Sequence, residues 1–231
     1  MAALAETTDD LLAIFRGEVS DIVNDVTLLE YTRLWKDPEI FGYMTEACDA
    51  LARDTELLYE VSSIGYLAGD LTVPLPAHIL KIRSVRMVTA NKTLRPNNAN
   101  GPRTVYRDYG IVSPSSMFGV SGTPLEYVRD YDIGALRLVP TPIVADTLEL
   151  QSSVTIPDAL GTGDDVPFTE AIDQRLVLEY MKSRAYRKQD AETQDFKRAD
   201  DAKAAYEIGA LKRAEQIRKY RRAAGVVQYQ F

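Results

Sequence analysis

Residues 166–214 decide the fold, and they read VPFTEAIDQRLVLEYMKSRAYRKQDAETQDFKRADDAKAAYEIGALKRA. Apolar side chains recur in this stretch at spacings of three and four residues, which is the period of an amphipathic helix. The pattern predicts one helix over about 167–187, a short break at 188–190 and a long helix over 191–223. Gly225 is expected to end the long helix, because glycine adopts the backbone conformation that closes a helix without strain.

Two further helices are predicted toward the N-terminus. Residues 8–24 carry apolar side chains about three and four apart, with Thr8 or Asp9 as a cap. A second helix is expected over 38–58. Its start is well marked, because Asp37 can accept hydrogen bonds from free backbone N–H groups and Pro38 suits the first helical position.

From Leu71 onward the helical period disappears and a β-rich region is predicted. Short apolar runs alternate there with turn-forming residues, which is typical of strands. The expected strands lie within 78–88, 93–95, 103–106, 125–130, 135–139 and 147–154. The last three are expected to be consecutive antiparallel strands of a small sheet or sandwich.

The order of these segments predicts an α+β fold. Both ends of the chain would form one helical bundle, into which an antiparallel β-sheet or small sandwich is inserted. The expected boundaries are 1–70 for the N-terminal helices, 71–160 for the β-rich insertion, 161–224 for the C-terminal helices and 225–231 for an extended tail.

The last six residues, VVQYQF, have the alternation of a strand. Val227, Tyr229 and Phe231 would lie on one side of it. A terminal strand with an aromatic row is either a docked edge strand or a peptide for a neighbouring protein. These three residues are therefore candidate contacts to a neighbouring protein.

The net charge of −7 is unevenly distributed along the chain. Residues 1–60 contain fourteen acidic side chains against four basic ones, whereas residues 203–222 contain seven basic side chains against two acidic ones. Both regions can be solvated helix faces. Alternatively, they complement neighbouring subunits or nucleic acid.

The basic end supplies a second candidate interaction site. Its members are Lys212, Arg213, Arg218, Lys219, Arg221 and Arg222. Such a cluster can hold phosphates without sequence preference or form salt bridges to an acidic partner. Only Tyr220 interleaves with these cations, so the stacking surfaces of a single-strand binding protein are missing.

The sequence supports no enzyme class, cofactor or metal site. His78 is the single histidine and Cys48 the single cysteine, so the usual ligands of structural zinc and an internal disulfide are both missing. The glycines of Gly161–Asp165 precede a helix, but they are followed by two carboxylates where a phosphate-binding loop needs a lysine. We also expect no secretion signal and no membrane span.

Several segments resemble the head-to-tail adaptor, or connector, proteins of tailed bacteriophages, of the short-tailed type. The segments are LWKDPEI (34–40), EACDALARDTELL (46–58), VPLPAHILKIRSVRM (73–87), GTPLEYVRD (122–130), ALRLVPTP (135–142) and the opening stretch 166–214. The resemblance rests on their order and spacing.

The resemblance implies a ring, typically of twelve copies, bound beneath the portal protein. Such a ring extends the DNA channel, lets DNA pass non-specifically and offers a platform to tail or nozzle proteins. It would be located at the head–tail junction of the virion and assembled in the host cytoplasm. Two other readings stay open: another virion protein, such as a tail-completion or stopper subunit, and a DNA-binding accessory protein that uses the basic helix 212–222.

Overall fold

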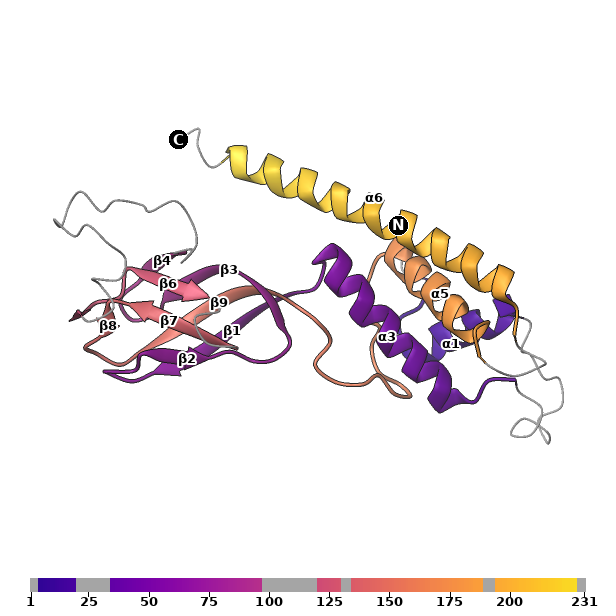
Figure 1. The fold of residues 1–231 in the computed structure, drawn as a ribbon, viewed down its shortest axis with the longest axis horizontal. Coiled ribbons are helices and arrows are strands. Elements are labelled where there is room, and N and C mark those ends of the chain that lie inside the picture. The colour runs from indigo at the N-terminus through magenta and orange to yellow at the C-terminus, as the bar shows by residue number, and fades with distance from the viewer. Residues whose placement is uncertain (1–3, 20–33, 97–119, 130–133, 189–193, 228–231) are drawn as a thin grey trace. The chain divides into compact units, whose positions relative to one another are not determined.

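The computed structural model describes residues 4–19, 34–96, 120–129, 134–188 and 194–227, with side chains placed up to residue 221. The chain divides into two compact units (Figure 1). A helical unit combines Met1–Leu58 with Thr155–Phe231, and a β unit consists of Tyr59–Val154. The combination of helices with a mainly antiparallel sheet confirms the predicted α+β class.

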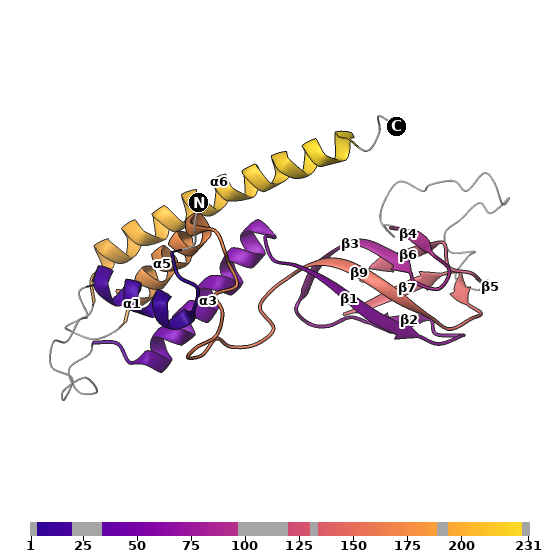
Figure 2. The same cartoon turned by 180° about the vertical axis from the view of Figure 1, so that it is seen from behind.

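Four helices form the helical unit, among the residues described. They are α1 (Thr8–Val19), α3 (Asp37–Thr55), α5 (Ala171–Ala185) and α6 (Phe196–Val227). Helix α5 packs against both α6 and α3, and α1 contacts α5 and α3 (Figure 2). All four predicted helices are present. The long helix, however, continues through Gly225 to Val227, so the expected helix stop at Gly225 is wrong and the first two residues of the expected strand are helical. Residues 228–231 of that strand lie outside the described residues.

Local hydrogen bonds explain where the helices begin and end. Thr7 and Asp10 cap α1 reciprocally: Asp10 Oδ2 accepts from the Thr7 N–H at 3.1 Å, and Thr7 Oγ1 accepts from the Asp10 N–H at 3.3 Å. The cap of α3 is Lys36 rather than the expected Asp37, which lies inside the helix and forms an ion pair with Arg16. Helix α3 ends at Thr55, and the next residue, Glu56, caps it with a left-handed φ of 53°.

Trp35 is the centre of the core of the helical unit. Its indole is 1% exposed, and its Nε1–H donates to the carbonyl of Ala185 at 3.2 Å. Phe15 and Tyr186 meet the indole edge-on, each with ring centroids 6.2 Å apart. Trp35, which lies just before α3, thereby joins α1 to the end of α5.

Gln174 fastens the segment before α1 to α5. Its buried side-chain oxygen accepts from the N–H groups of Leu4 and Ala5, and its Nε2 donates to the carbonyls of Ala5 and Phe168. All four hydrogen-bonding positions of the amide are used, so this polar group is buried at little cost.

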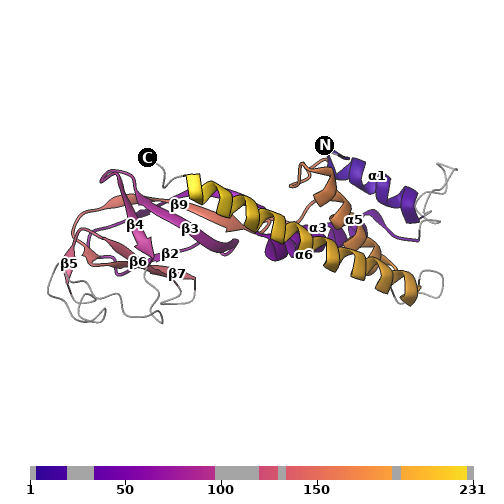
Figure 3. The ribbon, with the colours of Figure 1, turned by 90° about the horizontal axis from the view of Figure 1, so that it is seen from above.

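A seven-stranded sheet forms the β unit, in the order β1-β9-β3-β4-β6-β7-β2. Its strands are β1 (Tyr59–Tyr66), β2 (Thr72–Pro74), β3 (Ile79–Met87), β4 (Lys92–Pro96), β6 (Glu126–Arg129), β7 (Ala135–Val139) and β9 (Asp146–Val154), and β5 (Ser121–Gly122) pairs separately with β8 (Thr141–Pro142). Figure 3 shows the strands from a second direction. Leu148 and Leu150 of β9, which lies between β1 and β3, are fully buried.

Three sequence expectations for the β unit need correction. Strand β1 replaces part of the helical segment assigned to 1–70, and the units divide at 58/59 and 154/155 rather than at 70/71 and 160/161. Strands β6 and β7 do pair antiparallel, but β9 pairs with β1 and β3 instead of β7. One pairing in the sheet, β4 with β6, is parallel. The strand expected at 103–106 lies outside the described residues.

Candidate interaction surface on the C-terminal helix

Helix α6 supplies the surface on which the predicted basic cluster lies. Its 32 residues extend over about 48 Å at 1.5 Å per residue. Ala199, Ala202, Tyr206 and Ala210 are buried, as their spacing predicted. Phe196 and Tyr220 of the same helix are 62% and 74% exposed, because the neighbouring helices do not cover them.

Helices α5 and α6 approach closely at Gly209. A Cβ atom built there would lie 2.3 Å from Leu176 Cδ2 of α5. Tyr206, one turn before it, donates its hydroxyl to Asp54 Oδ2 of α3 at 2.7 Å. The first part of α6 is therefore fixed against two helices, which leaves its opposite side free to face outward.

Arg213 belongs to the interior rather than to the basic surface. It is 8% exposed, and its Nε and one terminal amino group donate to the two carboxylate oxygens of Asp173, both at 2.8 Å. Glu170 pairs with the same guanidinium at 2.7 Å. These hydrogen bonds and charges raise the pKa of Arg213 despite its burial, so the side chain stays charged.

Arg221 also has partners within the helical unit. Its guanidinium pairs with the Glu56 carboxylate at 2.8 Å and donates to the Glu56 carbonyl at 2.7 Å. Because Glu56 caps α3, this contact ties the last described side chain of α6 to the end of α3. The predicted cluster thus loses two of its cations to internal pairing.

Lys212, Arg218 and Lys219 remain as exposed cations. Within the part of the chain that the structure describes, no acidic side chain pairs with them. Arg222 and Val227 lie in α6, but their side chains are not among those described. Tyr229 and Phe231 lie outside the described residues, so their expected contact to a portal or neighbour stays a prediction.

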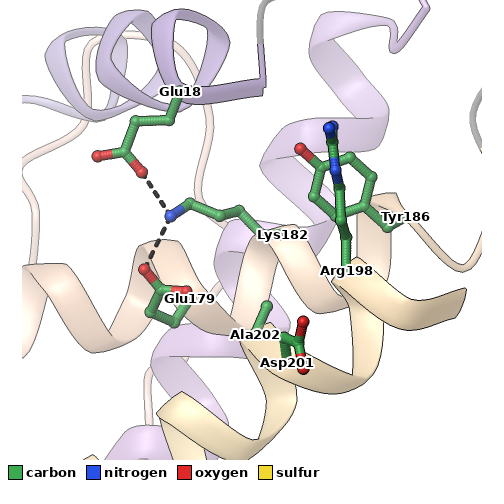
Figure 4. A pocket seen from close by; sticks show the side chains of 7 residues that line it. All are labelled: Glu18, Glu179, Lys182, Tyr186, Arg198, Asp201 and Ala202. Carbon is green, nitrogen blue, oxygen red and sulfur yellow. Dashed lines mark hydrogen bonds and ion pairs between the residues drawn. The ribbon is translucent and has the colours of Figure 1, made fainter. Parts of the chain in front are cut away.

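A charged hollow of about 490 Å³ lies where α1, α5 and α6 meet (Figure 4). Lys182 lies in it between Glu18 and Glu179, with its Nζ 2.6 and 2.7 Å from their carboxylates. Both carboxylates raise the pKa of Lys182, although burial acts to lower it. The two ion pairs thus favour the charged form of Lys182, whereas a nucleophile or base would need the neutral amine.

His78 has an acidic neighbour in the β unit. Its Nε2 lies 2.9 Å from Glu60 Oε2, within hydrogen-bond distance. The described residues contain no group of three or more His, Cys, Asp or Glu side chains that could hold a metal ion. None of the described helices is long and apolar enough to cross a bilayer.

Sequence reasoning missed the acidic partners Asp173 and Glu56. The sequence did contain a signal for Asp173. This residue lies one helical turn before Leu176 and Val177, so it falls on the buried side of α5, where a charged group requires a partner. No comparable pattern marks Glu56, whose role depends on the way α3 ends.

Comparison with known families identifies the chain. A family model described as SU10 adaptor protein matches residues 9–228, nearly the whole length. A comparison with curated proteins finds no match. The family match confirms the resemblance to head-to-tail adaptors of bacteriophages, a structural rather than enzymatic class. The chain belongs to the SU10 adaptor protein family.

Proposed function

We propose that the protein is the subunit of an adaptor ring that joins the portal to the tail of a bacteriophage and extends its DNA channel. The observation that carries this function is the family match over residues 9–228. The ring would contain about twelve copies, lie at the head–tail junction of the virion and assemble in the host cytoplasm. Its partners would be the portal protein, tail or nozzle proteins and further copies of itself.

The charge of the chain supports a passive channel wall. A net charge of −7 repels the phosphate backbone, so DNA can pass without being held. The acidic residues 1–60 and the basic residues 203–222 support contacts between different surfaces of identical copies, which is the geometry that closes a ring.

The structure disfavours a DNA-binding accessory protein that uses residues 212–222. Arg213 and Arg221 are engaged with Asp173 and Glu56, and Glu215 is exposed among the remaining cations. Binding to bare duplex DNA that weakens steeply with salt would support that alternative instead.

Electron microscopy of the protein mixed with its portal tests the proposal. The expected image is a closed ring stacked coaxially on the portal. A stopper or tail-completion subunit would leave the isolated portal bare and bind only after another protein has been added. Absence of rings at every portal concentration would contradict the adaptor function.

A truncation tests the tail residues Val227, Tyr229 and Phe231. Removal of 225–231 is expected to leave a folded protein that no longer joins the portal, because α6 is held by contacts that precede these residues. Circular dichroism provides the control for folding, and co-sedimentation with the portal provides the readout. Normal incorporation of the truncated protein would contradict a role for this tail.

A further inference from the structure

An apolar ridge lies on the outer side of α6. It consists of Ala204, Ile208 and Leu211, which a helix of 3.6 residues per turn places on one stripe. Ile208 is 54% and Leu211 67% exposed. The buried Tyr206 and Ala210 lie on the opposite stripe, so this α6 ridge faces away from α5 and α3.

The surroundings of the ridge are basic toward the C-terminus. Lys212, Arg218 and Lys219 are all exposed within the next turns, whereas Glu215 is the single acid between them. An apolar stripe followed by cations favours a partner surface that is apolar in the centre and acidic at its edge.

The helical unit has such a surface at the start of α3. A hollow of about 480 Å³ lies there against the 159–162 segment. Its lining consists of Asp37, Pro38, Phe41, Gly42, Thr45, Ala159, Leu160, Gly161 and Thr162. The volume falls in the range of roughly 300–1,000 Å³ that encloses small ligands, so this α3 hollow has room for two aliphatic side chains.

The edge of the α3 hollow is acidic. The Asp37 side chain is 47% exposed, and the adjoining loop carries the exposed residues Asp158, Asp164 and Asp165. Asp164 shapes this loop, because its Oδ2 accepts from the Gly161 N–H at 2.6 Å. Lys36 is the one exposed base beside these four carboxylates among the described residues 34–45 and 156–166.

The ridge and the hollow lie on opposite sides of the helical unit. Figures 1 and 2 show α6 along one side and the loop before α5, with the start of α3, on the other. One copy therefore cannot fill its own hollow. Two different, complementary patches on opposite sides of a subunit join copies head to tail, and such contacts form a ring when the rotation from copy to copy closes.

We propose that the α6 ridge of one copy docks in the α3 hollow of the next copy. Ile208 and Leu211 fill the hollow, while Lys212 and the cations beyond it approach Asp37 and the acidic loop. This contact rests on the proposed ring and identifies the surfaces that build it.

Paired cysteines test the contact in the full-length protein. Gly42→Cys places a thiol in the hollow without a clash, since an added Cβ meets nothing within 4 Å, and Leu211→Cys places the other on the ridge. The native Cys48 does not interfere, because it is buried and its pKa is raised to about 12. Oxidation of assembled rings is expected to give a ladder of covalent multimers, which requires the two Cα atoms within about 7 Å.

The matched control combines Gly42→Cys with Ala205→Cys. Ala205 is exposed on the same helix, but roughly 120° around its axis from Leu211, so no ladder is expected. Rings that form normally without a Leu211 ladder, or with an equal ladder from Ala205, would overturn the ridge-in-hollow contact and leave the ring intact. If no rings form with or without the portal, the ring and this contact fail together.

A second variant tests the same contact without cysteines. Leu211→Asp puts a charge into the hollow of the neighbour and is expected to weaken assembly at least tenfold in sedimentation velocity, whereas Ala205→Asp leaves it unchanged. Both substitutions replace exposed side chains, so the folded subunit and its circular dichroism should not change. Equal assembly of the two variants would contradict the proposal.

Discussion

At Gly209 the contact between α5 and α6 depends on the absence of a side chain. Glycine costs roughly 1 kcal/mol relative to alanine inside a helix, yet a Cβ here would lie 2.3 Å from Leu176 Cδ2. We expect Gly209→Ala to lower the free energy of unfolding by about 1–2 kcal/mol, because the buried Leu176 must move. Thermal or urea unfolding measures the change.

Gly42 provides the opposite case in the same unit. A Cβ at this exposed position of α3 meets nothing within 4 Å, so Gly42→Ala should stabilise the protein by about 0.5–1 kcal/mol. Equal effects of the two substitutions would mean that helix propensity, and not the approach of α6 to Leu176, decides the outcome at Gly209.

The buried pair of Arg213 and Asp173 makes a second prediction for single residues. Arg213→Met leaves the Asp173 carboxylate buried without its partner, and is expected to cost about 3–5 kcal/mol in unfolding free energy. Combining it with Asp173→Leu should recover most of that loss, because both charges are then gone. Lys212→Met, at the exposed neighbouring position, should change stability by less than about 0.5 kcal/mol.

At the scale of elements, the helices were predictable and much of the sheet was not. Apolar spacing locates α3 because this helix buries one continuous apolar stripe. Helix α5 is buried more widely, and its buried residues include the polar Asp173, Gln174 and Ser183. Strand β1 escaped detection, since its exposed and half-buried residues lack a clear apolar face and it follows α3 after three residues. The pairing of β9 with β1 joins residues about ninety positions apart, and no local pattern encodes such a partner.

The contact of α1 with α5 should make the helical unit sensitive to acid. Burial acts to raise the pKa of Glu18, but the hydrogen bonds and charges of Lys182 and Arg175 outweigh it and lower this pKa. A carboxylate whose pKa is lowered by folding stabilises the folded state. This stabilisation is complete at pH values above the pKa of the unfolded chain, 4.5. That contribution is lost as the pH falls further, through the folded-state pKa.

The substitution Glu18→Gln isolates this effect. It should reduce stability at pH 7 by under about 1 kcal/mol, as expected for a partly exposed ion pair, and make little difference well below pH 4. Urea unfolding at a series of pH values measures both. Glu215→Gln, at an exposed position of α6, is the control, and an unchanged pH profile for Glu18→Gln would contradict the assignment.

At the scale of the whole molecule, the sequence located the basic cluster but did not show which of its cations are exposed and which are paired inside the helical unit. Its spacing predicted a helix bearing six cations, whereas the fold buries Arg213 against Asp173 and turns Arg221 toward Glu56. Both partners lie far away in the sequence, on α5 and at the end of α3. Which cations remain outside therefore depends on tertiary packing, which helical periodicity does not contain.

The helical unit is expected to fold without the β unit. Its core cluster takes all its residues from the two outer parts of the chain, and the ends of the insertion are neighbours because Tyr59 pairs with Ser153. Replacement of residues 59–154 by a short glycine–serine linker should leave a cooperative, helical melting transition in circular dichroism. A product without cooperative unfolding would contradict the independence of the unit.

The burial of Trp35 between Phe15, Tyr186 and the Ala185 carbonyl has a practical consequence. The chain contains one tryptophan, and it lies in the helical unit. Indole emission reports the water exposure of that single ring. Tryptophan fluorescence therefore follows the unfolding of the helical unit and does not report the unfolding of the sheet. The protein thus carries an optical label for one of its two parts without any added dye.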